Sequence, residues 1–217
     1  MTRTFEELIP DLLGARGLTG VPPNIAVFHL RKAAIELCER SHVWSQVLEI
    51  DSQSGVQDYP LELPGDAKVV AVREVKIGNC CLSPDRSGLC GGCGCHQFRV
   101  EGNHTLWVPE SHQDEEQAIK VLVVCKPGQD ACNFPEELYE DWSDVIADGA
   151  AYRCFAMPKT EWYSAGMVTF YMKKFNVGVT RAKNHRVLQR TTGPLMMVGA
   201  RFSWNKKTHA GASTGSL

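Results

Sequence analysis

The spacing of apolar residues changes twice along this chain, and this change constrains the fold more than any single motif. Between residues 24 and 40, apolar residues recur every three or four positions, which is typical of a helix with one buried face. From Val47 to Cys125 they alternate with polar residues, as in β-strands. After Pro127 the helical spacing returns. This order predicts an α+β chain: a helical bundle with an inserted small antiparallel β-domain and an extended C-terminal arm.

Local signals mark where the expected helices begin. Thr4 and Glu7 have the spacing of a capping box, in which each side chain accepts a hydrogen bond from a backbone N–H at the start of a helix. Pro22, Pro23 and Asn24 open a second helix. Pro135 stands at the first position of a later helix, where a missing N–H costs nothing. Thr160 is the expected cap of a last, long helix.

Short β-branched runs separated by turn residues give the expected strands. They cover residues 47–50, 59–63, 68–77, 98–100, 105–108 and 119–125. Four regions follow from these boundaries. They are N-terminal helices of the bundle at 1–45, the inserted β-domain with a Cys-rich loop at 46–127, C-terminal helices of the bundle at 128–192 and the extended arm at 193–217.

The composition excludes several classes of protein. With 43% hydrophobic and 22% charged residues, the chain of 217 residues is neither disordered nor collagen-like. No apolar run approaches the roughly 20 residues that a membrane helix needs, and acids interrupt the first apolar stretch at Glu6, Glu7 and Asp11. The chain therefore lacks the pattern of a signal peptide and is expected to be cytoplasmic, without a membrane partner.

Charge is distributed unevenly although the net charge is only -2. Residues 102–161 hold twelve acids and four bases. No acid follows Glu161, and the last 56 residues hold nine bases: Lys173, Lys174, Arg181, Lys183, Arg186, Arg190, Arg201, Lys206 and Lys207. Such a chain can dock head to tail on copies of itself, or place its basic end on an acidic partner or on phosphates.

Cysteines cluster in the β-region. Five of them and one histidine fall within 17 residues, namely Cys80, Cys81, Cys90, Cys93, Cys95 and His96. Cys90 and Cys93 have the two-residue gap of a zinc knuckle, and Cys80 and Cys95 complete a candidate structural zinc site, with Cys81 or His96 as substitutes. The alternative is a glycine-rich hairpin tip with free or oxidisable thiols. Cys38, Cys125, Cys132 and Cys154 are expected to be core thiols.

Motifs of catalysis are missing from the sequence. It contains no G-x-G-x-x-G, no phosphate loop, no G-x-S-x-G elbow and no H-E-x-x-H. Asp114, Glu115 and Glu116 are paired carboxylates only in appearance, because a polar loop explains them better. The sequence therefore predicts a protein that is not an enzyme.

Several motifs in one order resemble a known family. A helix at 24–40 is followed by Val43-Trp44, then by Asp58-Tyr59-Pro60-Leu61 and Leu63-Pro64 before a valine-rich strand. Later, Phe134-Pro-Glu-Glu-Leu-Tyr-Glu-Asp-Trp142 leads into a helix rich in Ala and Gly. This order, over residues 1–190, resembles the head-to-tail adaptor proteins of tailed bacteriophages. The cysteine cluster departs from the family pattern.

The resemblance implies a structural virion protein. Twelve copies would form a ring under the portal, join the capsid to a tail or nozzle protein and let DNA pass through a channel without sequence-specific binding. The family's C-terminal arm grips the portal protein. Its counterpart here is 195–217, and the residues expected to make this contact are Arg201, Phe202, Trp204, Lys206 and Lys207.

A second reading remains open from the residues alone. Bases on the last helix, with Phe202 and Trp204 available for stacking, also fit a zinc-containing nucleic-acid-binding module. Such a module would bind DNA tightly and lose the binding on chelation, whereas a ring around a DNA channel would bind DNA weakly.

Overall fold

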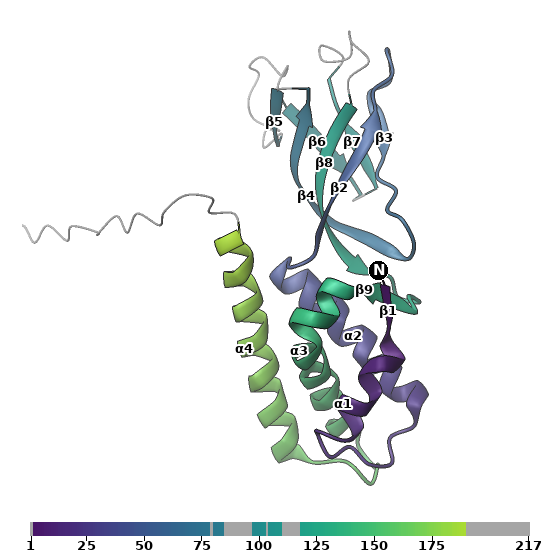
Figure 1. The fold of residues 1–217 in the computed structure, drawn as a ribbon, viewed down its shortest axis with the longest axis vertical. Helices are drawn as coiled ribbons and strands as arrows, with labels where there is room; N and C mark the ends of the chain where they lie inside the picture. The colour runs from purple at the N-terminus through teal and green to yellow at the C-terminus, as the bar shows by residue number, and fades with distance from the viewer. Residues whose placement is uncertain (1, 79, 85–96, 103, 110–117, 190–217) are drawn as a thin grey trace, which may run out of the picture.

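The computed structural model describes residues 2–78, 80–84, 97–102, 104–109 and 118–189. Figure 1 shows helices in one half of the molecule and a β-sheet in the other. The helical half is built from a 3-10 turn, η1, and four helices. Their bounds are η1 Phe5–Leu8, α1 Ile9–Leu13, α2 Pro23–Ser41, α3 Glu136–Phe155 and α4 Ala165–Gln189. Helix α3 packs between α2 and α4, and α4 runs antiparallel to it.

The larger sheet has seven strands in the order β2-β8-β4-β5-β6-β7-β3 and curls into a nearly closed, barrel-like form. The strand bounds are β2 Ser45–Asp51, β3 Asp58–Pro60, β4 Ala67–Ile77, β5 Cys80–Pro84, β6 Gln97–Glu101, β7 Thr105–Trp107 and β8 Ala118–Pro127. Strand β5 pairs with β6 in parallel, so the sheet is mixed. A separate two-stranded antiparallel sheet joins β1 Thr2–Thr4 to β9 Asn133–Pro135.

The expected helical bundle with an inserted small antiparallel β-domain is therefore wrong. The sheet forms as much of the architecture as the helices do, and it is not wholly antiparallel. Alternation of apolar residues indicates a strand but not the direction of its neighbour, so the parallel pair left no signal in the sequence. The small β1–β9 sheet was missed because its three-residue strands are too short to show a period.

Local sequence signals predicted one helix start correctly and another incorrectly. The capping box at Thr4 is confirmed, since its backbone N–H donates to Glu7 Oε1 at 3.1 Å. The cap predicted at Thr160 is wrong: its hydroxyl donates to the Met157 carbonyl at 2.9 Å, and α4 begins five residues later, after Ser164. The predicted arm at 193–217 lies outside the described residues.

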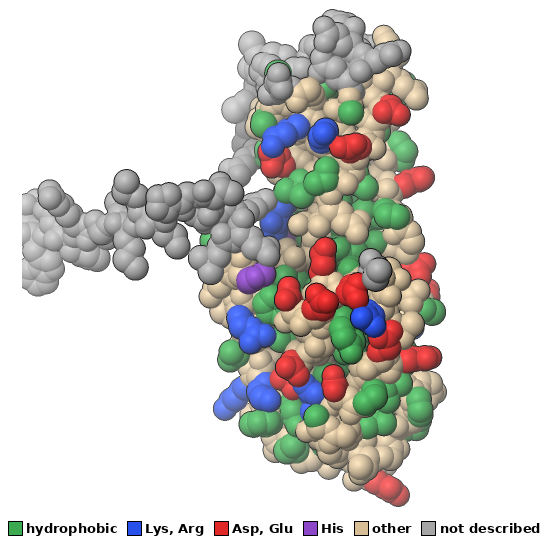
Figure 2. Space-filling view, in the orientation of Figure 1, with side chains coloured by type: hydrophobic (Ala, Val, Ile, Leu, Met, Phe, Trp, Pro, Cys, Tyr) green, Lys and Arg blue, Asp and Glu red, His purple; other side chains and the backbone are tan. Residues whose placement is uncertain are grey.

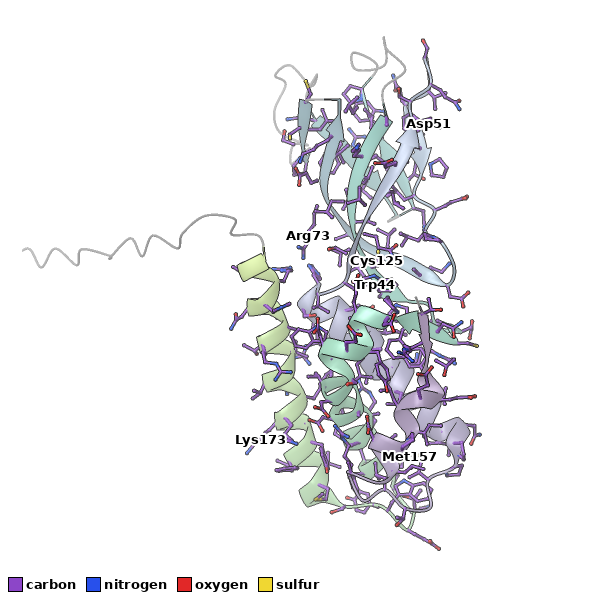
Figure 3. All side chains as sticks on the ribbon, viewed as in Figure 1. Trp44, Asp51, Arg73, Cys125, Met157 and Lys173 are labelled. Atoms are coloured by element: carbon purple, nitrogen blue, oxygen red, sulfur yellow. The ribbon has the colours of Figure 1, made fainter. Side chains whose placement is uncertain are left out.

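One continuous apolar core runs through both halves of the molecule. Glycines allow the helices to approach closely, because a Cβ on Gly149 would lie 2.7 Å from the Phe175 ring and one on Gly178 would lie 2.6 Å from Val145. At the junction of the halves, the Cys125 N–H of β8 donates to the Trp44 carbonyl at 3.0 Å (Figure 3). No helix in the described parts of the chain is long and apolar enough to span a membrane.

Candidate interaction surface

Helix α4 covers the core with one face and presents apolar side chains to solvent on the other. Tyr171, Phe175 and Val179 are buried at helical spacing. Phe170 is 51% exposed and Val177 is 70% exposed. The close contact of Gly178 with Val145 fixes the rotation of α4, and in this rotation Phe170 lies on the outward face. Exposed large apolar residues beside charges are typical of contact surfaces.

A groove of about 590 Å³ lies between α3 and α4. Phe170 and Val177 line it, together with the cations Lys173, Lys174 and Arg181 of α4. Arg181 lies over the Trp142 ring of α3, 5.2 Å from its centroid, so this cation also holds the two helices together. The α4 side of the groove therefore combines apolar area with positive charge.

A buried ion pair forms the floor of the groove. The Arg16 Nε donates to Asp148 Oδ1 at 2.8 Å, and the two side chains are only 7% and 11% exposed. Arg16 also donates to the Asp144 carbonyl at 2.9 Å, so the loop after α1 is fastened to α3. Lys174 Nζ lies 3.7 Å from the second oxygen of Asp148. In the sequence, only its apolar neighbours distinguish Asp148 from other acids. Its partner Arg16 lies 132 positions away, so no local pattern predicts this ion pair.

Acidic side chains form a stripe along the exposed face of α3. Glu137, Glu140, Asp141 and Asp144 recur at three- and four-residue steps and are all exposed. Of these, Asp144 contacts Arg16 at 3.4 Å. The other three form no ion pair with a described residue. Figure 2 shows the resulting arrangement, with Asp and Glu gathered over α3 and Lys and Arg over α4.

The residues expected to bind the portal, Arg201, Phe202, Trp204, Lys206 and Lys207, lie outside the described residues. The same is true of Cys90, Cys93, Cys95 and His96 in the expected zinc site. Cys80 and Cys81 are described, at the start of β5, and both are exposed. Within the described ranges, no three His, Cys, Asp or Glu side chains are grouped to hold a metal ion.

The four cysteines outside the cluster at 80–96 differ in burial. Cys38, Cys125 and Cys154 are buried, as expected for core thiols, whereas Cys132 is exposed and that expectation was wrong for it. Burial raises the pKa of the Cys125 thiol to about 12 and that of Cys154 to about 11. Both therefore remain protonated near neutral pH, a form that is a poor nucleophile and a poor metal ligand.

Comparison with known proteins gives no family assignment, because no protein-family model and no curated protein matches this chain. The interpretation of the surface therefore depends on its chemistry. It offers a cationic, partly apolar face on α4 beside an exposed acidic stripe on α3, and these two helices pack against each other.

Proposed function

We propose that the protein is a structural, non-catalytic component that assembles head to tail into a ring, as the connector between the portal of a tailed bacteriophage and its tail. The observation that carries this proposal is the pairing of two unlike surfaces on one helix pair. The face of α4 is cationic with exposed apolar residues, and the stripe on α3 is acidic.

Complementary surfaces on one chain favour a heterologous contact. When the α4 face of one copy docks on the α3 stripe of the next, the first copy's stripe and the second copy's α4 face are still unoccupied. Repetition of such a contact closes a ring if the rotation permits, and otherwise gives a filament. Phe170 and Val177 would supply the apolar centre of the contact, and the charges around them would set its register.

The first test is the mass of the assembly. A native mass spectrum is recorded for the chain alone and for the chain mixed with a portal ring from the same source. The connector proposal expects about twelve copies on each portal ring, the number that the family resemblance implies. Absence of binding to the portal at concentrations where the ring stays intact contradicts it.

A charge swap tests the proposed contact itself. Lys173→Glu and Asp141→Lys should each abolish assembly, because each places like charges across the interface. The chain that carries both changes should recover assembly, since the attraction is restored with opposite signs. Lys120→Glu, on strand β8, is the matched control and should assemble normally. Equal assembly by all four variants would refute the α3–α4 contact while leaving the mass experiment to judge the ring.

A further inference from the structure

Two hollows adjoin each other where the helical half meets the sheet. The larger has a volume of about 460 Å³ and the smaller about 210 Å³. Trp44, Ser45 and Glu137 line both hollows, so we treat them as one groove and call it the junction groove. Figure 3 shows Trp44 at this junction. At one end the groove is lined by His185 of α4, and at the other by Asp66, which precedes β4.

The junction groove has apolar walls and acidic charged groups. Its apolar lining includes three aromatic residues and three prolines, namely Trp44, Phe134, Trp142, Pro64, Pro127 and Pro135. Its carboxylates are Asp66, Glu137 and Asp141, and none of them forms an ion pair with a described residue. No Lys or Arg of the described chain lines either hollow, although Lys183 and Arg186 stand close to His185 in the sequence. The lining therefore suits a ligand that is both cationic and aromatic.

Strand β2 presents unpaired backbone groups to the same place. The Cys125 N–H donates to the Trp44 carbonyl at 3.0 Å, which makes these two residues a hydrogen-bonded pair in line with the β2–β8 register. Such pairs alternate with non-bonded ones between antiparallel strands, so the N–H and C=O of the next residue, Ser45, point away from β8. Neither group bonds to a described residue, and β2 is an edge strand of the sheet. A free edge of this kind accepts an extended peptide.

The chain itself carries a segment of the required chemistry. No acid occurs after Gln189, the last described residue. Residues 201–207, Arg-Phe-Ser-Trp-Asn-Lys-Lys, combine three cations with two aromatic residues. We call them the basic segment. Its three cations match the three carboxylates of the junction groove in number and sign, and its aromatic residues match the apolar walls.

Helix α4 leads the chain to the groove. His185 lines the groove, and α4 ends four residues later at Gln189, about one helical turn further on. Figure 1 shows this end of α4 at the level of the junction. The residues from Gln189 to Arg201 can span up to about 40 Å when extended, so the basic segment can turn back onto its own chain. A short tether raises the effective concentration of such a segment to about the millimolar range.

We propose that the basic segment docks in the junction groove of its own chain. Its backbone pairs with Ser45 on the free edge of β2, and its cations lie on Asp66, Glu137 and Asp141. The segment of a second copy has the same chemistry, but the tether favours the segment that starts one turn from the groove. The proposal goes beyond assembly and requires neither a ring nor a portal. It follows that any other partner of the basic segment must compete with the groove for it.

Cross-linking of the full chain tests which residues meet. An equal mixture of unlabelled and 15N-labelled chains is treated with a carbodiimide, which joins a carboxylate to an amine in direct contact, and the links are mapped by mass spectrometry. Lys206 or Lys207 should be linked to groove carboxylates, and the two linked peptides should carry the same label. Asp51, exposed at the end of β2, is the reference carboxylate. Links between unlike labels would assign the groove to a second copy, and links no more frequent at the groove than at Asp51 would show that the segment does not dock. Either result overturns the proposal.

Hydrogen exchange at Ser45 tests the backbone pairing. Its N–H, followed by NMR, should exchange at least about tenfold more slowly in the unaltered chain than in the chain with Arg201→Glu, Lys206→Glu and Lys207→Glu together, because docking supplies an acceptor. Lys120→Glu, on strand β8, is the control and should keep the protection. Rapid exchange in the unaltered chain, or protection that survives the three changes, overturns the proposal, with thermal unfolding curves confirming that each variant is folded.

Discussion

The cations on the two flanks of α4 differ in how their charge is balanced by carboxylates. On the α3 flank, Arg16 and Lys174 contact Asp148, and the acidic stripe lies alongside. On the α2 flank, Glu36 of α2 contacts both Arg40 and Arg153. The first flank contains both signs of charge, as a self-complementary surface requires. On the second flank, one carboxylate holds two cations.

The largest effect on stability is expected at the Arg16–Asp148 ion pair of the α3 flank. Arg16→Met removes the main partner of the buried Asp148, leaves Lys174 as its remaining cation and should cost about 3–5 kcal/mol of unfolding free energy. Urea denaturation provides the measurement. The double variant Arg16→Met with Asp148→Leu should recover most of the loss, because no uncompensated charge stays buried. A loss below about 1 kcal/mol for the single variant would show that the pair behaves like a surface ion pair.

The next largest effect on stability is expected from the packing between α3 and α4. Gly178→Ala places a Cβ 2.6 Å from the methyl groups of Val145 and should cost about 1–3 kcal/mol through overpacking. Gly166, in the first turn of α4, has no neighbour within 4 Å of an added Cβ. Gly166→Ala should therefore stabilise the protein by up to about 1 kcal/mol. Thermal denaturation of both variants compares them, and equal shifts would mean that the helix contact is looser than described.

A smaller change is expected from the shared carboxylate of the α2 flank. Glu36→Gln removes the partner of two partly exposed arginines and should cost about 1 kcal/mol. Glu49→Gln, on β2, removes a carboxylate paired with Lys120 in the sheet and is the control. Urea denaturation measures both variants, and an equal loss of stability would mean that the shared carboxylate contributes no more than a single exposed ion pair.

The smallest effect is a pH dependence from His42. Its pKa is lower in the folded protein than the unfolded value of about 6.5. Between these two values the unfolded chain binds more protons, so stability falls as pH decreases through this window. His42→Asn retains a residue that tolerates the positive φ and removes the titration. The variant should lose less stability between pH 7 and pH 5, measured by urea denaturation. His29, whose pKa is also lowered by burial, is common to both chains and cancels in the difference.

Sequence patterns located most elements but few of their partners. The helical spacing at 24–40 corresponds to α2 Pro23–Ser41, and the valine-rich run at 68–77 corresponds to β4 Ala67–Ile77. These elements were predictable because burial of one face imposes a local period on the residues themselves. Strands β4 and β8 are some 50 positions apart in the chain, and no local pattern in the sequence predicts the register between them.

By itself, the sequence determined where most of the helices and longer strands lie, and that acids end at Glu161 while bases continue. Tertiary structure decided which charges meet. It placed Arg16 on Asp148, brought Arg73 to His42 and turned Phe170 outward. The physical reason is that the spacing of apolar residues indicates only whether a position faces the core. Partners far apart in the chain are selected by the packing of whole helices and strands, to which each residue contributes only a part.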